Sequence, residues 1–535
     1  MGVGSNRAIG VALRLVALVV ATFVVLSSAR AEIVLRWASA GGALTFDPHG
    51  HNVTPTHAIQ HQVYEPLVLL GHDLALEPAL ATAWALVDAT TWEFTLRRGV
   101  RFHDGSGFTA DDVVFSLNRA RAETSDIKHW FVTVADVQAT GQYTVRIKTS
   151  RPDMILPVRL NRTMIMSRAW AAGHGVAAPS RPNDAQEGYT LRHANGTGPF
   201  RLEEFEPNGR FVMARNPDWW NLHSGNVDRI IHEAIPDPDE RMAAILDGDI
   251  DFLLDPPFAA LERIRATPGF KLEQTTEFRT IFLALDQGSR ELRSSNVRGR
   301  NPFHDRRVRQ AMYQAIDIER IRDEVMQALA LPAGMIIEPG VNGYSPDLDR
   351  RLSYDPGAAR QLLAQAGYAD GFSVTLDCPN NRYANDEAIC HVVASQLGEV
   401  GIAVAVDAKP MNEHSAKLFD RQTDFYLFGW GGGGFILDSV DTLRGWYHTA
   451  GGGNRFNVTG YGNPRVDELI AAIDAEIVTY LHDVLVEKVW RVALDDIALL
   501  PLHHQVLVWA LREDLELPID PRGFPWFQIA RLVER

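Results

Sequence analysis

A short stretch, residues 103–112, combines side chains that acid–base catalysis uses. It places His103, Ser106 and three aspartates within ten positions, with glycines between them. A histidine, a hydroxyl and carboxylates transfer protons or activate a nucleophile when a fold brings them together. The residue types alone therefore allow a catalytic site, and the question is which structure the stretch forms.

The same residues are also typical of a turn followed by a capped helix. Residues 103–107 contain the Asp and Gly residues that tight turns use. Thr109 stands three residues before Asp112, which is close to a capping box, and acidic residues suit the positive end of a helix dipole. The apolar residues that would form the buried face of this helix are Val113, Val114 and Leu117. Because each polar residue has a structural role here, we expect a turn and a helix rather than a catalytic site.

Four consecutive glycines, Gly431–Gly434, follow the strand-like run Phe425–Trp430. Glycine lets another group approach the backbone closely, so the run is a candidate for ligand contact. It lacks the lysine and the spacing of a phosphate-binding loop. The chain also contains no H-E-x-x-H or G-x-S-x-G motif, so an exported hydrolase is the less favoured interpretation.

Four histidines lie close together near the start of the chain: His49, His51, His57 and His61. His57 and His61 have the i, i+4 spacing with which two side chains of one helix can bind a metal. No cysteine or carboxylate completes a convincing set of ligands. Metal binding therefore stays an alternative, and we expect no cofactor.

The N-terminus has the features of a secretory signal peptide. Arg7 and Arg14 precede the apolar run Leu15–Leu26, whose 12 residues are too few to span a bilayer comfortably. An A-x-A site follows and predicts cleavage after Ala31. An uncleaved membrane anchor is the alternative, but no cysteine follows the site and no later segment is apolar enough to span. We expect an exported protein in the periplasm.

Length and charge limit the classes of protein further. About 500 residues remain after cleavage, which is enough for two or three lobes. The signal segment contains three arginines and no acid, so the formal charge goes from −15 to −15 − 3 = −18. A nucleic-acid partner needs a basic surface, so we expect none.

The two cysteines, Cys378 and Cys390, predict a disulfide. A close pair in an exported chain forms a disulfide more often than a metal site, and the spacing is not the C-x-x-C of redox proteins. Closing a loop of this size adds about 3 kcal/mol in the chain-entropy model.

The elements that position these residues alternate between strand-like and helix-like patterns, which predicts an α/β fold. Trp92–Leu96 alternates as a half-buried strand does. Strands at Val374–Leu376 and Ile402–Val406 flank a helix at Asp386–Val400, which predicts a β-α-β unit with parallel strands. Further helices are expected at Arg306–Ile321 and Gly357–Ala366.

Several long segments resemble one protein family. The stretch LRRGVRFHDGSGFTADDVVFSLNRA closely resembles the signature of the family 5 extracellular solute-binding proteins, the periplasmic dipeptide- and oligopeptide-binding proteins of ABC importers. The other matching segments, in the order of the family, are LTFDPH, VYEPLV, LEPALATAW, GTGPFRLEEFEPNGRFVMARNPDWW, FHDRRVRQAMYQAID and YDPGAARQLLAQAGY. They cover essentially the whole mature chain.

The resemblance implies two α/β lobes hinged around a cleft, with an extra domain in the first half. Lobe I would comprise residues 32–75, 191–287 and 505–535, the extra domain 76–190, and lobe II 288–504. It also implies a binding protein that is not an enzyme. We expect a monomer that captures short peptides or peptide-like solutes and delivers them to an inner-membrane permease. A non-peptide solute, such as an oligosaccharide, an opine or a metal chelate, is the alternative.

The resemblance also implies a ligand site, with one departure from the family. In the peptide-binding relatives an aspartate three residues after a Gly-Trp pair binds the α-ammonium of the peptide, whereas Gly433 stands three residues after Trp430 here. Asp438 is the possible replacement, or it caps the next helix. Trp430 stacks on a ligand or fills the core. The full set of candidates is Ala43, Thr45, Arg382, Trp430, Gly431, Gly433, Phe435 and Asp438.

The segment Asp377–Asp386 resembles a subgroup of the family that carries a cysteine pair here. Either Arg382 or Asn385 would face the cleft. The alternative is a loop that the disulfide fixes and that has no contact with a ligand. Residues 41–45 match a crossover region where relatives offer backbone groups to a bound peptide, a mode that recognises length more than side chains.

Overall fold

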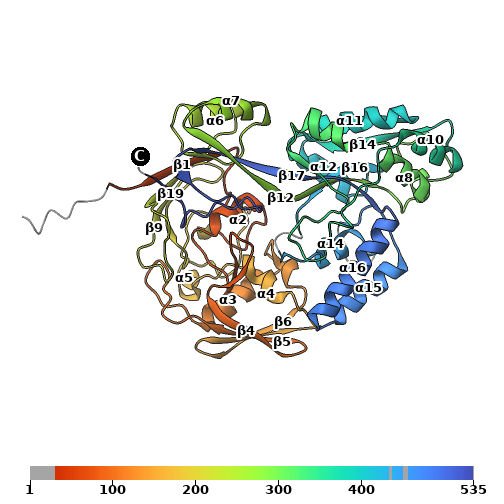
Figure 1. Cartoon of the computed structure of the whole chain (residues 1–535). Helices are drawn as coiled ribbons and strands as arrows, with labels where there is room; N and C mark the ends of the chain where they lie inside the picture. The colour runs from red at the N-terminus through yellow and green to blue at the C-terminus, as the bar shows by residue number, and fades with distance from the viewer. Residues whose placement is uncertain (1–30, 433–435, 450–455, 534–535) are drawn as a thin grey trace, which may run out of the picture.

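One large mixed sheet extends through the molecule, and two of its strands are much longer than the others. The computed structural model describes residues 31–432, 436–449 and 456–533. β12 (Phe270–Leu285) and β17 (Leu499–Arg512) pair antiparallel and cross from one half of the molecule to the other (Figure 1). The strand order is β15-β14-β16-β12-β17-β11-β1-β10-β9-β8, and β13 pairs with β17. The two halves of the molecule are therefore joined through these long strands.

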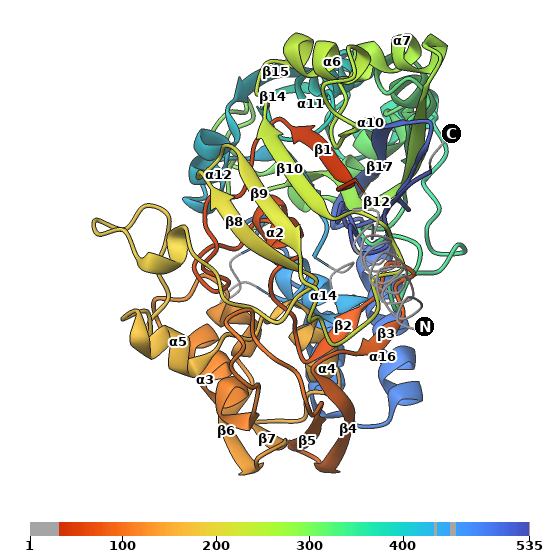
Figure 2. The ribbon, with the colours of Figure 1, turned by 90° about the vertical axis from the view of Figure 1, so that its left-hand side faces the viewer.

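On one side of the long strands the sheet continues through strands from the first half of the chain. β1 pairs parallel with β10 and β11, and β8, β9 and β10 follow as antiparallel neighbours, side by side in Figure 2. Trp37 on β1 stacks against Phe252 with ring centroids 5.6 Å apart, at the centre of a buried apolar cluster. The elements of this side are β1 (Val34–Ser39), β8 (Phe200–Phe205), β9 (Phe211–Arg215), β10 (Arg229–Ala234), β11 (Phe252–Leu253), α2 (Thr54–Gln60), α6 (Pro238–Leu246) and α7 (Leu261–Ala266).

On the other side of the long strands the sheet has helices on both faces. Alternate side chains of a strand point to opposite faces. Accordingly, Ile281 and Leu283 join an apolar cluster with α8 and α11, whereas Phe282 joins a cluster with α14, α15 and α16. The strands are β13 (Ala330–Pro332), β14 (Phe372–Pro379), β15 (Ile402–Lys409) and β16 (Phe425–Trp430). The helices are α8 (Arg306–Gln314), α9 (Ile318–Arg320), α10 (Pro356–Gln365), α11 (Asp386–Glu399), α12 (Met411–Phe419), α14 (Val440–Trp446), α15 (Pro464–Ala475) and α16 (Thr479–Asp495).

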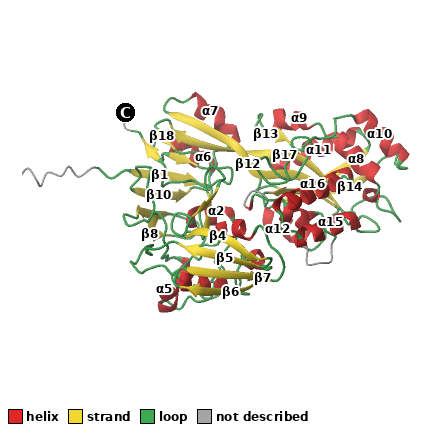
Figure 3. Ribbon diagram, turned by 60° about the horizontal axis from the view of Figure 1, so that its bottom comes forward, coloured by secondary structure: helices red, strands yellow, loops and turns green. Residues whose placement is uncertain are grey.

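A separate four-stranded sheet of order β4-β5-β7-β6 forms its own layer below the first side (Figure 3). Its apolar face and α3 bury a further cluster that includes Phe94, Val113 and Leu117. The elements are β4 (Ala81–Asp88), β5 (Thr91–Leu96), β6 (Val134–Gly141), β7 (Thr144–Thr149), α3 (Ala110–Ala120), α4 (Leu156–Arg159) and α5 (Arg168–Gly173). The remaining short elements are β2 (Val68–Leu70), β3 (Leu76–Pro78), β18 (Leu515–Glu516), β19 (Arg531–Leu532), η1 (Lys128–Phe131), η2 (Leu160–Arg162), η3 (Tyr189–Leu191), η4 (Phe258–Ala260), η5 (Pro302–His304) and η6 (Ile321–Val325).

The stretch 103–112 forms the turn and the capped helix that its sequence predicts. Asp104 accepts hydrogen bonds from the backbone and the hydroxyl of Ser106, at 2.9 and 2.6 Å. The Asp112 carboxylate accepts from the Thr109 amide at 2.9 Å, at the start of α3. His103 is bonded through Nε2 to the carbonyl of Gly198 at 3.0 Å. The polar side chains of the stretch are thus engaged in local structure.

Most of the expected elements form, and one expected helix is shorter. The β-α-β unit is confirmed, since β14 and β15 are parallel and α11 lies between them in the chain. A continuous helix over 306–321 is wrong, because α8 ends at Gln314. Asp317 accepts from the amides of Glu319 and Arg320 and starts a new helix there, since an Asx cap competes with continuation of the preceding helix.

The architecture confirms the α/β class. Among the described residues, no helix has both the length and the apolar character needed to cross a membrane. The predicted signal peptide, residues 1–31, lies almost entirely outside the described residues. The exact division into lobes stays a prediction.

Candidate ligand-binding site

The candidate site forms where β12, β16 and the loop after β14 meet. Thr280 of β12 is the register partner of Trp430 at the end of β16, so Arg279 and Trp430 lie near one another on adjacent strands. The loop after β14 reaches the same place, because the hydroxyl of Tyr383 donates to the carbonyl of Gly429 at 3.2 Å. Three segments that are far apart in the chain therefore converge on the middle of the long strands.

Two guanidinium groups flank the ring of Tyr383 at this point. The Arg279 guanidinium carbon lies 5.8 Å from the ring centroid and that of Arg382 lies 5.7 Å from it. Arg279 forms an ion pair with Glu277 at 2.9 Å, and Glu277 also accepts from Gln505 at 2.5 Å. Two cations thus lie close together here, and the Glu277 carboxylate is already paired with Arg279.

Arg382 differs from Arg279 in the partner of its guanidinium, which is the ring of Tyr383 rather than a carboxylate. Its side chain is exposed, and no carboxylate in the described part of the chain forms an ion pair with it. Desolvation by the surrounding protein and repulsion from Arg279 lower the pKa of Arg382. For Arg279, desolvation lowers the pKa but the Glu277 carboxylate outweighs it, and the pKa is raised overall. Arg382 is therefore the group that an incoming anion would stabilise.

Trp430 is half-buried and has partners within its own half of the molecule. Its ring packs edge-on against Trp446 at 5.5 Å and Phe456 at 4.8 Å between centroids. The indole Nε1 donates to the hydroxyl of Thr442 at 2.9 Å. The tryptophan thus belongs partly to the core and leaves part of its surface accessible, so it connects the end of β16 to α14.

Gly431 is a position where only glycine fits the observed backbone. A Cβ built on this residue would lie 2.1 Å from the carbonyl oxygen of Phe278. The chain after β16 therefore runs directly against β12. The predicted contacts of Gly433 and Phe435 fall outside the described residues.

Asp438 precedes Ser439, the N-cap residue of α14, and its carboxylate bonds the first residue of that helix. Its Oδ1 accepts from the backbone amide of Val440 at 2.8 Å, in the first turn of α14. Its Oδ2 accepts from the amide nitrogen of Asn342 at 2.8 Å, and the side chain is buried. Both carboxylate oxygens are thus bonded within the chain, which favours capping over contact with an α-ammonium group.

Ala43 and Thr45 are both fully buried. The carbonyl of Ala43 accepts from the amide of Asn208 at 2.7 Å. The carbonyl of Thr45 accepts from the side chain of Gln60 at 3.1 Å. These hydrogen bonds hold the loop after β1 in place. Each carbonyl oxygen already accepts one bond, so a predicted contact with a ligand would have to use its second lone pair.

The four histidines that are close in sequence make separate contacts within the protein. His49 is bonded to the carbonyl of Met164 at 3.0 Å, and His57 to the side chain of Asn52 at 3.1 Å. His61 stacks on Phe524 at 5.2 Å. Burial lowers the pKa of His61 to about 4, so it is neutral at physiological pH. In the described parts of the chain no three His, Cys, Asp or Glu side chains are grouped as metal ligands would be.

The sequence missed Arg279, Tyr383 and Glu277. Glu277 and Arg279 are charged and stand on either side of the apolar Phe278 in a strand, which is a weak signal for one accessible face. Nothing in the sequence pairs this strand with the loop that carries Arg382. The disulfide between Cys378 and Cys390 is confirmed, and it joins β14 to α11 on either side of that loop.

Comparison with known proteins identifies the family. The model of the bacterial extracellular solute-binding proteins, family 5 Middle, matches residues 75–454, which is more than half of the chain. The chain belongs to this family. The expected membership is therefore confirmed, and the family is one of solute-binding proteins rather than of enzymes.

Individual relatives of this solute-binding protein are distant. It is 24% identical over 469 residues to the glutathione-binding protein GsiB of Salmonella choleraesuis, covering 84% of this chain and 85% of the relative. The Helicobacter pylori periplasmic binding protein DppA in complex with the peptide STSA is similar with a TM-score of 0.74 and 19% identity, over 92% of this chain and 97% of that one.

A third relative has a bound ligand that is not a peptide. AgaA from A. tumefacien R10, in complex with agropinic acid, has a TM-score of 0.74 and 22% identity, over 94% of this chain and 99% of that one. At these identities the solved structures show a shared fold. The expected periplasmic-binding-protein fold is confirmed.

Proposed function

We propose that this solute-binding protein is the periplasmic component of an ABC importer and captures short peptides or peptide-like acids. The observation that carries the proposal is the guanidinium of Arg382, which lies beside Arg279 and Tyr383 and forms no ion pair with any described residue. A planar guanidinium binds a carboxylate through two parallel hydrogen bonds. A ligand carboxylate would supply the ion-pair partner that Arg382 lacks among the described residues.

Arg279 supports this role without being the main ligand contact. Its ion pair with Glu277 fixes its position on β12, which holds a positive charge close to Arg382. A bound anion relieves the repulsion between the two guanidinium groups, so the site favours an acid over a neutral solute. The ligands for which these relatives are named or with which they were solved, glutathione, a peptide and agropinic acid, all carry acidic groups.

The amino end of a peptide has no comparable partner among the described residues. Both oxygens of Asp438 are bonded within the chain, and Gly433 stands where peptide-binding relatives have an aspartate. We therefore place charge recognition at the acidic end of the ligand. The ligand's remaining contacts would come from Trp430 and Gly431.

The proposal includes a hinge between two lobes. We take residues 32–75, 191–287 and 505–535 as lobe I, 76–190 as the extra domain and 288–504 as lobe II. The separate apolar clusters on either side of β12 and β17 support this division. Ligand binding would shift the equilibrium between an open and a closed form by bending at these strands. The closed form would dock on an inner-membrane permease as a monomer, without catalysis, after export and cleavage at Ala31.

A thermal-shift screen tests the proposal. Di- to pentapeptides with a free C-terminal carboxylate should raise the melting temperature of the mature protein, since a ligand at a hundredfold excess over its Kd stabilises by about 2.7 kcal/mol. The same peptides with a C-terminal amide should give a much smaller shift. The variant Arg382→Gln should bind the free acids at least about tenfold more weakly.

Arg360→Gln is the matched control, because Arg360 is an exposed arginine of the same half of the molecule that bonds only the carbonyl of Glu399. It should behave as the parent protein. Equal shifts for acid and amide, or no effect of Arg382→Gln, would overturn the proposed site. A shift with an opine-like acid but with no peptide would keep the anion site and replace the peptide as ligand.

A further inference from the structure

Two parts of the molecule that are distant in sequence meet below the long strands. The segment between β7 and α4 lies against α14 and α15, and β12 and β17 cross the molecule above α14 (Figure 1). The first segment belongs to the four-stranded sheet and its helices. The second belongs to the helical layer around β16. Movement about the long strands would separate these two surfaces.

Five charged side chains of alternating sign cross this contact. Arg159 Nη2 lies 2.6 Å from Asp441 Oδ1, and Arg444 Nη1 lies 3.2 Å from the same oxygen. Arg444 also forms an ion pair with Asp474, and Asp474 with Arg151. The chain of ion pairs therefore starts in one part of the molecule, crosses to the other and returns. Its order is Arg159–Asp441–Arg444–Asp474–Arg151. We call this set the charge latch.

The charge latch is held firmly at one end. The Arg159 side chain is only 7% exposed, and its Nε lies 3.9 Å from Asp153 Oδ1. Burial lowers the pKa of Arg159, but Asp441 and Asp153 outweigh it and the pKa is raised overall. Asp153 is itself fixed by the hydroxyl of Thr133 at 2.6 Å. If Asp441 moved away, the buried Arg159 would keep only the more distant Asp153 as an ion-pair partner. Leaving a buried charge poorly paired costs free energy, so this ion pair resists separation of the two surfaces.

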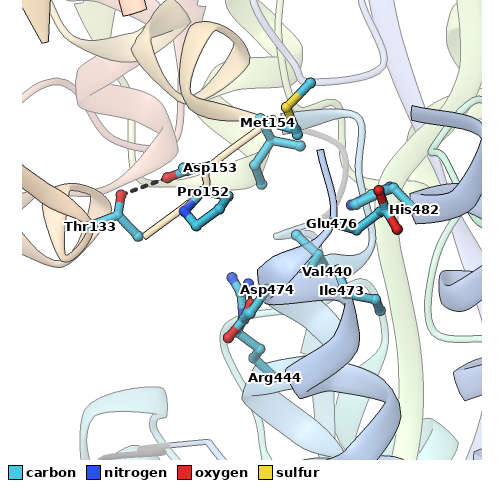
Figure 4. A pocket seen from close by; sticks show the side chains of 11 residues that line it. Thr133, Pro152, Asp153, Met154, Val440, Arg444, Ile473, Asp474, Glu476 and His482 are labelled. Carbon is cyan, nitrogen blue, oxygen red and sulfur yellow. Dashed lines mark hydrogen bonds and ion pairs between the residues drawn. The ribbon is translucent and has the colours of Figure 1, made fainter. Parts of the chain in front are cut away.

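The surfaces around the charge latch are almost completely packed. Ile155 contacts the apolar cluster formed by β12, β16 and α14–α16, although it lies between β7 and α4. A cavity of about 20 Å³ remains between the two parts and has room for roughly one water molecule. Figure 4 shows its walls, with Asp153 and Met154 from one part and Arg444, Asp474 and His482 from the other.

The charge latch is also connected to the candidate ligand site. Asp441 lies in the first turn of α14, next to Thr442, whose hydroxyl accepts from the indole of Trp430 at 2.9 Å. A change in the position of Trp430 at the site is therefore transmitted to the residue beside Asp441. This contact gives a physical route from ligand to closure.

We propose that the charge latch holds a fraction of the protein in the closed arrangement, even before any ligand binds. Closure brings the two outer arginines against carboxylates that face water when the surfaces are apart. The latch strengthens at low ionic strength, because salt screens exposed charges, and Arg151 is 39% exposed at its outer end. Any effect of the latch on ligand affinity rests on the proposed function. The closure of the ligand-free protein does not depend on it.

Electron–electron distance measurement on the ligand-free mature protein tests this proposal. Spin labels at Val87→Cys on β4 and Tyr480→Cys on α16 report the separation of the two parts, since both positions are exposed. The protein is unfolded and refolded beforehand to remove bound solutes. At about 0.02 M salt a population at the distance of the present structure is expected, and about 1 M salt should deplete it.

The variant Arg151→Glu should reduce the closed population at least fivefold at low salt, and Arg151→Gln should reduce it less. Arg168→Glu is the matched control: Arg168 is an exposed arginine of the same part of the molecule whose ion pair with Asp111 stays within that part. It should leave the closed population unchanged. The proposal fails if the parent has no closed population at low salt, or if Arg151→Glu behaves as Arg168→Glu. Neither result would bear on which ligand is bound.

Discussion

Glu338 is a buried carboxyl beside the long strands, and its protonation links pH to stability. The side chain is 1% exposed, and its Oε1 accepts from the hydroxyl of Thr280 on β12 at 2.9 Å. Burial raises the pKa of Glu338 from its ordinary 4.5 to about 8. The folded protein thus holds a proton there between pH 4.5 and 8 that the unfolded chain releases, so stability falls as pH rises through this window.

Glu338→Gln should remove this loss of stability. The amide keeps the size of the protonated carboxyl and does not ionise, so the variant should be more stable than the parent at pH 8 by on the order of 2 to 4 kcal/mol. At pH 5 the two proteins should be nearly equal. Urea unfolding at pH 5, 6, 7 and 8 measures the difference. Glu413→Gln, on the exposed start of α12, is the control and should give no such trend.

At the same scale, Arg382 could be predicted from the sequence as a candidate for ligand contact, whereas its neighbours could not. Arg382 was a candidate because it lies in a segment with a recognisable pattern. Arg279 and Tyr383 were not, because their significance depends on β12 and β16 being adjacent, which is a long-range pairing. From the sequence, Asp438 could either bind a ligand or cap the next helix. Its hydrogen bonds with Val440 and Asn342 favour the structural role.

The element that positions Arg382 is the loop between β14 and α11, which the disulfide closes. Cys378 ends the buried part of β14 and Cys390 lies in the first turns of α11, 12 residues later. Asp386 accepts from the amides of Arg382 and Tyr383 at 3.0 Å, which fixes the backbone at the candidate site. The strand, the helix and the bridge together limit where the guanidinium can be.

Replacing both cysteines by serine should lower the free energy of unfolding by about 3 kcal/mol, because the open loop gains conformational entropy when it unfolds. It should also weaken binding of acidic ligands, since Arg382 loses its fixed position. Denaturant unfolding and titration with a bound ligand measure the two effects. Reducing agent should reproduce them in the parent and have no effect on the double variant. Unchanged affinity would mean that Asp386 alone orders the loop.

The presence of most helices and strands could be predicted from the sequence, whereas the residues at which they end could be predicted less well. The alternation of β5 and the β-α-β unit of β14, α11 and β15 follow from local periodicity. The helix expected at 306–321 is interrupted because the Asp317 side chain caps a new helix. The spacing of apolar residues gives no information about such a side-chain hydrogen bond. The turn and capping box at 103–112 were predictable because the bonds that define them, from Ser106 to Asp104 and from Thr109 to Asp112, join residues at most three positions apart.

At the scale of the whole molecule, the two long strands join its halves, and the charge latch joins the four-stranded sheet region to the helical layer around β16; together they define how the parts can move. The ion pairs Arg159–Asp441 and Arg151–Asp474 join residues that are 282 and 323 positions apart in the chain. A sequence without relatives to compare gives no signal for such pairs. The family resemblance predicted the overall fold because its motifs cover the chain, but it did not contain the latch.

Native mass spectrometry of the mature protein as purified from the periplasm tests the proposed function most directly. We predict that the parent carries short peptides or peptide-like acids, that Arg382→Gln arrives without them, and that Arg360→Gln keeps them. A neutral solute such as an oligosaccharide on the parent, or the same ligands retained by Arg382→Gln, would contradict an anion-recognising site at Arg382.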